Sequence, residues 1–213
     1  MNKFKTTALL AAIALTGFGC QSTTGSAGGA SASASASAAV APAPDFESAQ
    51  FAQSIKGKKS KVELVQGTGV TVGKNAVKID FEGVSEANKN KFWPNAFMTP
   101  AGGVWDWSDK ESFTVDVTNP TDEHAFINFK VVDQAGTTGG GMPRQLNHKV
   151  MIPAGATEKV EVVFQAKLYN LPGYWGGDDL DLSKIKEVKI FIQGPIEKQT
   201  IILDNFTLIG PQS

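Results

Sequence analysis

Hydrophobic and polar residues alternate with a period of two along much of the chain after residue 45. In residues 77–82 and 113–118, apolar side chains occupy every second position and polar side chains fill the positions between them. This alternation is typical of strands with one buried and one solvated face, whereas a helix repeats every 3.6 residues. Only residues 178–186 have a brief helical pattern, with Asp181 or Ser183 as the N-cap.

Turn-forming residues separate further segments of the same kind. Glycine, proline and asparagine gather at residues 67–69, 119–122, 139–141 and 153–155. Between these turns the pattern predicts additional strands at residues 61–65, 125–133, 146–152, 158–164, 187–193 and 200–209. Eight or nine short strands without long helices predict an all-β fold, an antiparallel β-sandwich of the jelly-roll type.

The segment 125–133 differs from the others because both of its faces are apolar. Phe126 and Val132 fall on one face, and Phe129 falls on the other with its apolar neighbours. A strand with two apolar faces is expected at the centre of a sheet and under a cover. We expect the aromatic stretch 92–109 to contribute to that cover.

The first twenty residues resemble a bacterial lipoprotein signal. Lys3 and Lys5 precede an apolar run that is too short to span a bilayer, and Cys20 follows it. We expect residues 1–20 to be a signal peptide and Cys20 to carry the lipid. Gln21 is not the aspartate of inner-membrane lipoproteins, so the resemblance implies the outer membrane. The alternative is an ordinary secretory signal and a secreted or periplasmic protein.

Residues 21–44 consist mainly of Ser, Thr, Ala and Gly and close on Ala-Pro-Ala-Pro. This composition buries too little apolar surface to offset the entropy lost on ordering, so we expect a disordered tether before a folded domain at 45–213. The formal net charge is −1, which offers no basic face for nucleic acid. A single cysteine excludes an internal disulfide and a metal site built from several thiolates.

Aromatic residues gather in two stretches that lack regular structure. Three of the four tryptophans lie in residues 92–109, and residues 168–177 hold aromatic rings among glycines. Aromatic faces stack on the apolar side of a sugar ring, and planar polar groups bind its hydroxyls. The candidate ligand-binding residues are Tyr169, Asn170, Tyr174, Trp175, Arg144, Asn147, Trp105, Trp107 and Trp93.

Two of these assignments leave an alternative open. Trp105 and Trp107 are two residues apart and therefore share a face if extended, which suits core packing as well as sugar binding. Arg144 is the only arginine, and its planar fork suits either a sugar or a carboxylate of the protein. The stretch 169–177 is therefore our preferred binding loop.

Several short motifs occur in a characteristic order. They are Asp45-Phe46-Glu47, Trp93-Pro94, Trp105-Asp-Trp-Ser108, and the runs 115–122, 182–195 and 203–208. Together they resemble the non-catalytic jelly-roll module that precedes the catalytic barrel in glycoside hydrolase family 50 β-agarases. The resemblance covers residues 45–208 and implies a carbohydrate-binding sandwich of the galactose-binding-like type. A catalytic barrel needs about 250 residues, so we expect the catalytic part to be absent.

The resemblance to sugar-binding sandwiches also implies a structural calcium ion. Asp45 and Glu47 lie at one end of the domain and Asp204 at the other, and a jelly roll brings its ends side by side. Carboxylate oxygens are hard ligands that suit Ca²⁺. The alternative is that Asp204 and its neighbour only end a strand pair.

The sequence therefore supports three hypotheses about function. The first is a surface-anchored, non-catalytic carbohydrate-binding lipoprotein for algal, agar-type galactans. The second is a structural or protein-docking sandwich that serves a secreted agarase. The third is a glycoside hydrolase, which needs two carboxylates about 5–9.5 Å apart. Loop acids to supply such a pair are Asp106, Asp109, Asp178, Asp179 and Asp181.

Overall fold

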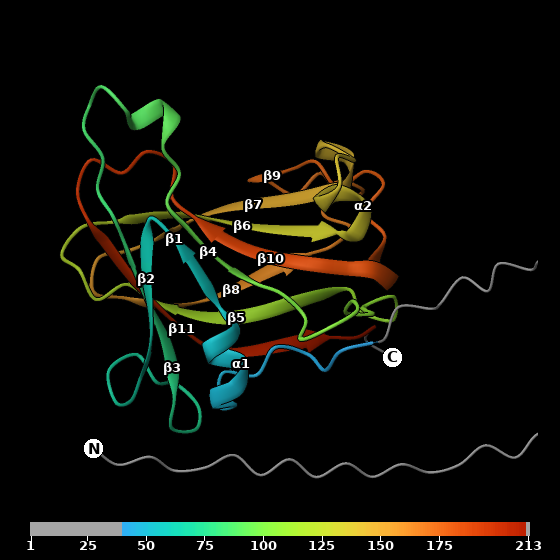
Figure 1. Ribbon diagram of the computed structural model, residues 1–213, viewed down its shortest axis with the longest axis horizontal. Coiled ribbons are helices and arrows are strands. Elements are labelled where there is room, and N and C mark those ends of the chain that lie inside the picture. The colour runs from blue at the N-terminus through green and yellow to red at the C-terminus, as the bar shows by residue number, and fades with distance from the viewer. Residues whose placement is uncertain (1–39, 212–213) are drawn as a thin grey trace, which may run out of the picture. The chain divides into compact units, whose positions relative to one another are not determined.

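The computed structural model describes residues 40–211, which form two antiparallel sheets (Figure 1). The six-stranded sheet has the order β1 (Lys56–Lys58), β4 (Asn95–Met98), β10 (Ile185–Phe191), β6 (Ala125–Asp133), β7 (Gln145–Ile152) and β9 (Tyr174–Trp175). The five-stranded sheet has the order β2 (Ser60–Val65), β3 (Ala76–Phe81), β11 (Gln199–Ile209), β5 (Ser112–Thr118) and β8 (Thr157–Val163).

The hydrophobic core lies between the two sheets. Ile79 and Phe113 come from the five-stranded sheet, Phe129 and Ile190 come from the six-stranded sheet, and all four belong to one buried cluster. Figure 1 shows the two layers, with β6, β7 and β10 lying over β5, β8 and β11. In strands such as β3 and β10, the alternation of apolar and polar residues therefore does place one face in the core. This confirms the antiparallel β-sandwich of the jelly-roll type.

The eight strands predicted from the periodicity are all present, and three further strands are not apparent in the sequence. Strands β1, β4 and β9 have three, four and two residues, which is too short to display a period of two. Two short helices were also missed, α1 (Ala49–Ser54) and α2 (Gln134–Thr137). The predicted helical segment contains only a 3₁₀ turn, η3 (Leu182–Lys184), which Asp181 caps as expected. Two other 3₁₀ turns are η1 (Lys89–Lys91) and η2 (Met142–Arg144).

The folded domain begins earlier than the sequence predicted. Val40 forms a parallel bridge with Val104, and the Ala41 N–H donates to the Val104 carbonyl at 2.9 Å. The Trp105 indole N–H donates to the Pro42 carbonyl at 2.8 Å, and Pro44 is buried. Residues 40–44 therefore belong to the domain and not to a disordered tether.

The remaining N-terminal predictions concern residues outside the described part of the chain. These are the signal peptide, Cys20 and the tether from residue 21 to residue 39. Within residues 40–211, no helix has the length and apolar character needed to cross a lipid bilayer.

Strand β6 is central, as predicted, because it pairs with β10 on one side and β7 on the other. Of the aromatic stretch expected to contribute to its cover, Trp93 lines a groove with Asn128 and Lys130 of β6, whereas Trp105 and Trp107 are buried in the core. Helix α2 packs against β6, and Val132 beside it is buried. Phe126 on the same face is 48% exposed. The outer face of the six-stranded sheet is thus open over part of β6.

Candidate functional site

A groove of about 260 Å³ crosses the outer face of the six-stranded sheet. Its walls and floor come from residues before or in β4, in β10, β6, β7 and β9, and from two adjoining turns. The lining residues are Trp93, Asn95, Asn128, Lys130, Met142, Asn147, Trp175, Lys189, Phe191 and Gln193.

The strand register shows that the groove runs across the strands. One transverse row passes from Lys189 through Lys130 and Asn147 to Trp175, each residue paired with the next on the neighbouring strand. The row beside it joins Phe191 to Asn128. From β4 to β9 there are four strand-to-strand steps, which amount to about 19 Å at the usual strand spacing. The groove is therefore long enough for an extended chain.

Trp93 forms one end of the groove. Its ring stacks on Phe191 with a centroid distance of 5.7 Å and an angle of 10° between the planes. The side-chain amide of Asn95 donates to the Trp93 carbonyl at 2.9 Å, which fixes the backbone just before β4. Trp93 remains 52% exposed, so one face of the indole is supported and the side chain is still accessible. This is the arrangement that stacking on a sugar ring requires.

Trp175 forms the other end, and its position depends on β9. The amide of Asn147 donates to the Gln145 carbonyl at 3.0 Å and to the Trp175 carbonyl at 3.5 Å, beside the β7–β9 pairing. Gly176 follows with φ of 73°, and a Cβ there would clash with the Gln145 carbonyl. The glycine therefore allows the chain to lie against β7. Trp175 is 38% exposed and lines the groove.

Tyr174 supports Trp175 instead of offering its own polar group to a ligand. Its hydroxyl donates to the Glu161 carbonyl at 2.9 Å and accepts from the Val163 N–H at 3.0 Å, which joins β9 to β8 of the other sheet. Its ring stacks on His148 at 3.8 Å. Burial raises the pKa of Tyr174. Tyr174 does not line the groove, so the prediction that it contacts ligand directly is corrected to a supporting role.

Burial also affects His148 beneath that ring. It lowers the pKa of His148, although the carbonyl of Gly173 acts in the opposite direction. The neutral imidazole is therefore the form that the fold favours. Because the His148 ring stacks on Tyr174 of β9, the neutral imidazole helps to hold β9 in place.

The floor of the groove is polar although it is largely buried. Asn128 and Asn147 are almost completely buried, and Lys130 and Lys189 are partly buried. The Asn128 amide donates to the Phe191 carbonyl at 3.4 Å. Burial lowers the pKa of Lys130, and the charge of Lys189 acts in the same direction. Amides held in fixed positions and two ammonium groups are suited to hydroxyl-rich ligands.

Trp105 and Trp107 lie in the core, which corrects their assignment as ligand-binding residues. Each is 1% exposed. Their rings stack on each other at 5.4 Å, and Trp107 also stacks on Phe164 at 5.6 Å. The Trp107 N–H donates to the Leu182 carbonyl at 2.8 Å, so the pair also holds the chain before β10. Rings enclosed in this way have no free face for a sugar.

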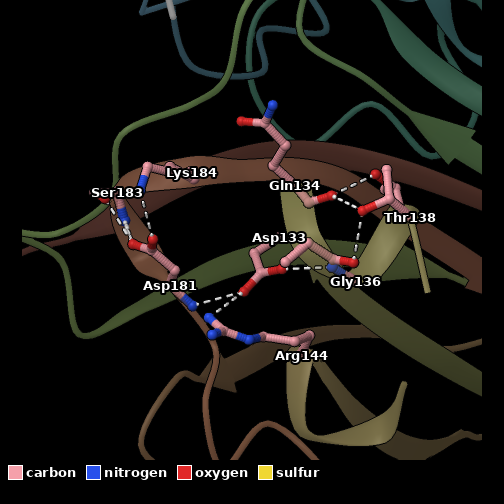
Figure 2. Close-up of polar contacts among 10 residues, drawn as sticks. Asp133, Gln134, Gly136, Thr138, Arg144, Asp181, Ser183 and Lys184 are labelled. Carbon is pink, nitrogen blue, oxygen red and sulfur yellow. Dashed lines mark hydrogen bonds and ion pairs between the residues drawn. The ribbon is translucent and has the colours of Figure 1, made fainter. Parts of the chain in front are cut away.

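Arg144 is part of a buried polar network at the end of β6, shown in Figure 2. Its guanidinium contacts the fully buried Asp133 carboxylate at 3.2 Å. The same carboxylate accepts from the Gly136 N–H at 2.7 Å and from the Asp181 N–H at 2.9 Å. Three loops are thereby joined at one side chain. Arg144 does not line the groove, so its prediction as a sugar ligand is corrected to that of an ion-pair partner.

Tyr169 and Asn170 lie at an exposed turn and do not line the groove. Tyr169 remains free to be contacted, but it shares no site with Trp175. Of the nine predicted ligand-binding residues, the structure brings together Trp93, Asn147 and Trp175.

The predicted calcium ligands do not form one site. Glu47 accepts from the N–H groups of Lys74 and Asn75 at 3.0 Å, and Asp204 accepts from those of Thr71 and Val72 at 2.5 and 2.8 Å. Asp45 accepts from a neighbouring backbone N–H at 3.0 Å. Within residues 40–211, no three His, Cys, Asp or Glu side chains gather as metal ligands. In this structure the three carboxylates hold the backbone, and the structural calcium ion stays a prediction.

Most of the groove floor was missed in the sequence. Asn128 and Lys130 interrupt the outer face of β6, and Lys189 occupies the corresponding face of β10. The interruption of an otherwise apolar face by Asn and Lys was the available signal. Only the pairing of β6 with β10 shows that these interruptions meet. No Asp or Glu is among the groove-lining residues, so the groove itself has no carboxylate pair for glycoside hydrolysis.

Comparison with known proteins identifies the family. Residues 45–167 match the agarase CBM-like domain, where CBM denotes a carbohydrate-binding module. The chain is also 44% identical over 208 residues to beta-agarase B of Vibrio sp. (strain JT0107). That match covers 98% of this chain and 21% of the relative, so the chain spans about a fifth of the length of beta-agarase B.

Solved structures agree on the fold. An exo-beta-agarase superposes with a TM-score of 0.63 at 20% identity, covering 81% of this chain and 25% of that one. A family 11 carbohydrate-binding module from Clostridium thermocellum, in complex with a mixed-linked tetrasaccharide, has a TM-score of 0.54 at 15% identity, covering 75% and 91%. The motifs from Asp45 onward thus occur in the fold that their resemblance implied, and this chain belongs to the family of agarase CBM-like domains.

Proposed function

We propose that this domain binds a galactan of the agar type along the groove between Trp93 and Trp175, without cleaving it. The observation that carries the proposal is the pair of exposed indoles at opposite ends of a polar, strand-crossing groove. The choice of galactan is supported by the 44% identity to beta-agarase B. The match to an agarase CBM-like domain supports a role in binding.

In this proposal, each part of the groove has a separate task. Trp93 and Trp175 stack on the apolar faces of sugar rings, because indoles provide large rigid surfaces with little entropy to lose. Asn147 and Gln193 hydrogen-bond hydroxyls between the two rings. The stack of Trp93 on Phe191 and the pairing of β9 with β7 hold the rings in place before the ligand arrives, which lowers the entropic cost of binding.

We also propose that Cys20 carries a lipid that anchors the domain to the outer membrane. The charged start of the chain, its short apolar run and Cys20 support this proposal. Residues 21–39 then separate the domain from the membrane surface. Held in this way, the groove retains polymer close to the cell.

The test of galactan binding is electrophoresis of the full chain through native gels with and without dissolved agarose. We expect the wild-type protein to be retarded by agarose. Trp175→Ala and Trp93→Ala should each reduce the affinity about tenfold or more, as is common for central aromatic contacts. Tyr169→Ala is the matched control, because Tyr169 is an exposed aromatic residue outside the groove. It should migrate like the wild type.

Two results would contradict the proposal. If the wild-type protein is not retarded by agarose or by other algal galactans, a structural or protein-docking role is favoured. If Tyr169→Ala abolishes retardation while Trp175→Ala does not, the ligand binds at the exposed turn. Incubation with agarose should produce no new reducing ends, and their appearance would support a glycoside hydrolase.

A further inference from the structure

Two lysines lie side by side on the groove floor. Lys130 of β6 and Lys189 of β10 are directly paired in the strand register, and both line the groove. Directly opposed residues of an antiparallel pair have Cβ atoms roughly 4.5–5.5 Å apart, and like charges at such positions repel. An uncharged ligand would not require this costly arrangement, because the neighbouring amides already supply hydrogen-bond donors.

The positive charge of the pair is only partly compensated. Lys189 forms an ion pair with Glu187 at 2.9 Å. Lys130 has no such partner, because none of the ion pairs found within residues 40–211 includes it. Burial and the charge of Lys189 both lower the pKa of Lys130, and the charge of Glu187 acts in the opposite direction without forming an ion pair with Lys130. The ammonium group of Lys130 is therefore held where an external anion would stabilise it.

The surroundings of the pair contain a third lysine and no acid that lines the groove. Lys149 is paired with Asn128 across β6 and β7, and its ammonium lies 5.6 Å from the ring of Phe126. Lys149 and Asn128 line a second hollow that adjoins the groove through Asn128 and Gln193. Lysine side chains therefore continue from the groove into the adjoining hollow beside β6.

We infer that the groove takes a galactan bearing anionic substituents, sulfate esters or carboxylates, and that Lys130 and Lys189 bind the anionic group. This inference rests on the proposed function, because it assigns the charge of the ligand in the same groove. The anion lies between the stacked sugar rings, where it offsets the repulsion between the two ammonium groups. The indoles and amides bind the uncharged part of the chain, and the lysines set the preference for charged polymers.

The test compares polymers that differ only in charge. The full chain is titrated with κ-carrageenan, a sulfated galactan, and with the same material after chemical desulfation. A pair of agar samples with and without pyruvate acetals tests carboxylate in the same way. We expect the anionic member of at least one pair to bind about tenfold more tightly at low ionic strength, as a charge-assisted hydrogen bond provides. Added salt should reduce this preference.

Substitutions then assign the preference to the lysine pair. Lys130→Met removes the ammonium and keeps an unbranched apolar stem, so it should weaken binding of the anionic polymer more than binding of its neutral counterpart and thereby abolish the preference. Lys130→Arg keeps the charge and should keep the preference. Lys61→Met is the matched control, since Lys61 lies on the other sheet and its side chain is 68% exposed. It changes the net charge equally and should leave the preference unaltered.

The outcomes separate this inference from the proposed function. Equal binding of charged and neutral polymers by the wild-type protein would overturn the inference and leave galactan binding intact. A preference that survives in folded Lys130→Met and Lys189→Met variants would overturn it as well. Binding to none of the galactans would overturn the proposed function and the inference together. The wild-type comparison decides the matter even if a variant fails to fold.

Discussion

At the scale of single residues, the four tryptophans divide into two pairs. Trp105 and Trp107 are enclosed between the sheets, where they stack on each other and on other aromatic rings. Trp93 and Trp175 are exposed at the two ends of the groove. The same side chain thus stabilises the fold in one pair and is available to a ligand in the other.

Replacing Trp105 should mainly affect stability. We expect Trp105→Ala to lower the free energy of unfolding by about 3–5 kcal/mol, because a large buried ring is replaced by a cavity. Trp175→Ala should remain within about 1 kcal/mol of the wild type, since its side chain is partly solvated. Chemical denaturation measures both values. A Trp105→Ala protein with wild-type stability and lost sugar binding would contradict the assignment.

His148 should make the domain sensitive to acid. Burial lowers its pKa below the ordinary value of 6.5, so between the two pKa values the unfolded chain binds more protons than the folded one. The stability that the neutral imidazole contributes is therefore present above about pH 6.5 and is lost as the pH falls below that value.

The corresponding measurement is thermal unfolding at about pH 7.5 and about pH 5.5. We expect the melting temperature of the wild-type protein to fall more between these conditions than that of His148→Gln. The difference between the two decreases in melting temperature gives the contribution of His148, because the carboxylates titrate in both proteins. Equal decreases in both proteins would show that His148 does not contribute.

At the scale of elements, one loop is held by carboxylates from opposite ends of the domain. The loop 66–75 joins β2 to β3, and Glu47 and Asp204 each accept from two of its backbone N–H groups. Phe46 and Phe206, next to or near these acids in the sequence, pack at 6.4 Å. The two motifs that suggested calcium thus provide a ring contact and a clamp for this loop.

Removing one clamp should destabilise the domain. Asp204→Ala leaves backbone N–H groups without their charged acceptor, and we expect a loss of about 2–4 kcal/mol in the free energy of unfolding. Asp109→Ala is the control, because its side chain is 72% exposed and pairs only with Lys110 in an exposed salt bridge. It should change stability by less than about 1 kcal/mol.

Chelation of the wild-type protein tests whether a bound calcium ion stabilises the domain. A chelator should leave the melting temperature of the wild-type protein unchanged, since the carboxylates are used by the backbone. A decrease on chelation that is restored by Ca²⁺ would show that a calcium site stabilises this fold.

At the scale of the whole molecule, the residues that hold the loops in place and the residues proposed to bind the ligand lie in different parts of the same sheet. The polar network of Asp133 and Arg144 joins three loops at one end of β6, while the indoles and lysines occupy the open face of the same sheet. Asp133 accepts from the Arg144 guanidinium of the Met142–Arg144 turn and from the Asp181 N–H before β10, and Met142 of that turn lines the groove. The support therefore reaches the edge of the groove.

Anchoring is tested on the whole chain in a bacterial host that processes lipoproteins. We expect radioactive palmitate to label the wild-type protein and to be absent from Cys20→Ala, because the cysteine thiol is the attachment point. Cell fractionation should place the labelled protein in the outer membrane. Palmitate incorporation that persists in Cys20→Ala, or that never occurs, would contradict the lipid anchor.

The periodicity of the sequence was sufficient to predict the β-sandwich and eight of its strands. A period of two lies in the side chains of each strand itself, so it can be recognised before the neighbouring strands are known. Strands β4 and β9 are too short to carry that signal, and it is their pairing with β10 and β7 that stabilises them. The order of the motifs from Asp45 to the Asp-Asn-Phe at residues 204–206 was likewise enough to indicate the agarase module family.

Only the tertiary structure decided which of the chemically suitable residues form a site. Burial separated Trp93 and Trp175 from Trp105 and Trp107, although all four have the same chemistry. Strand register brought Lys130, which is distant in sequence, beside Lys189. Burial and register depend on contacts between segments far apart in the chain. The sequence of one segment does not reveal which distant segment it will contact.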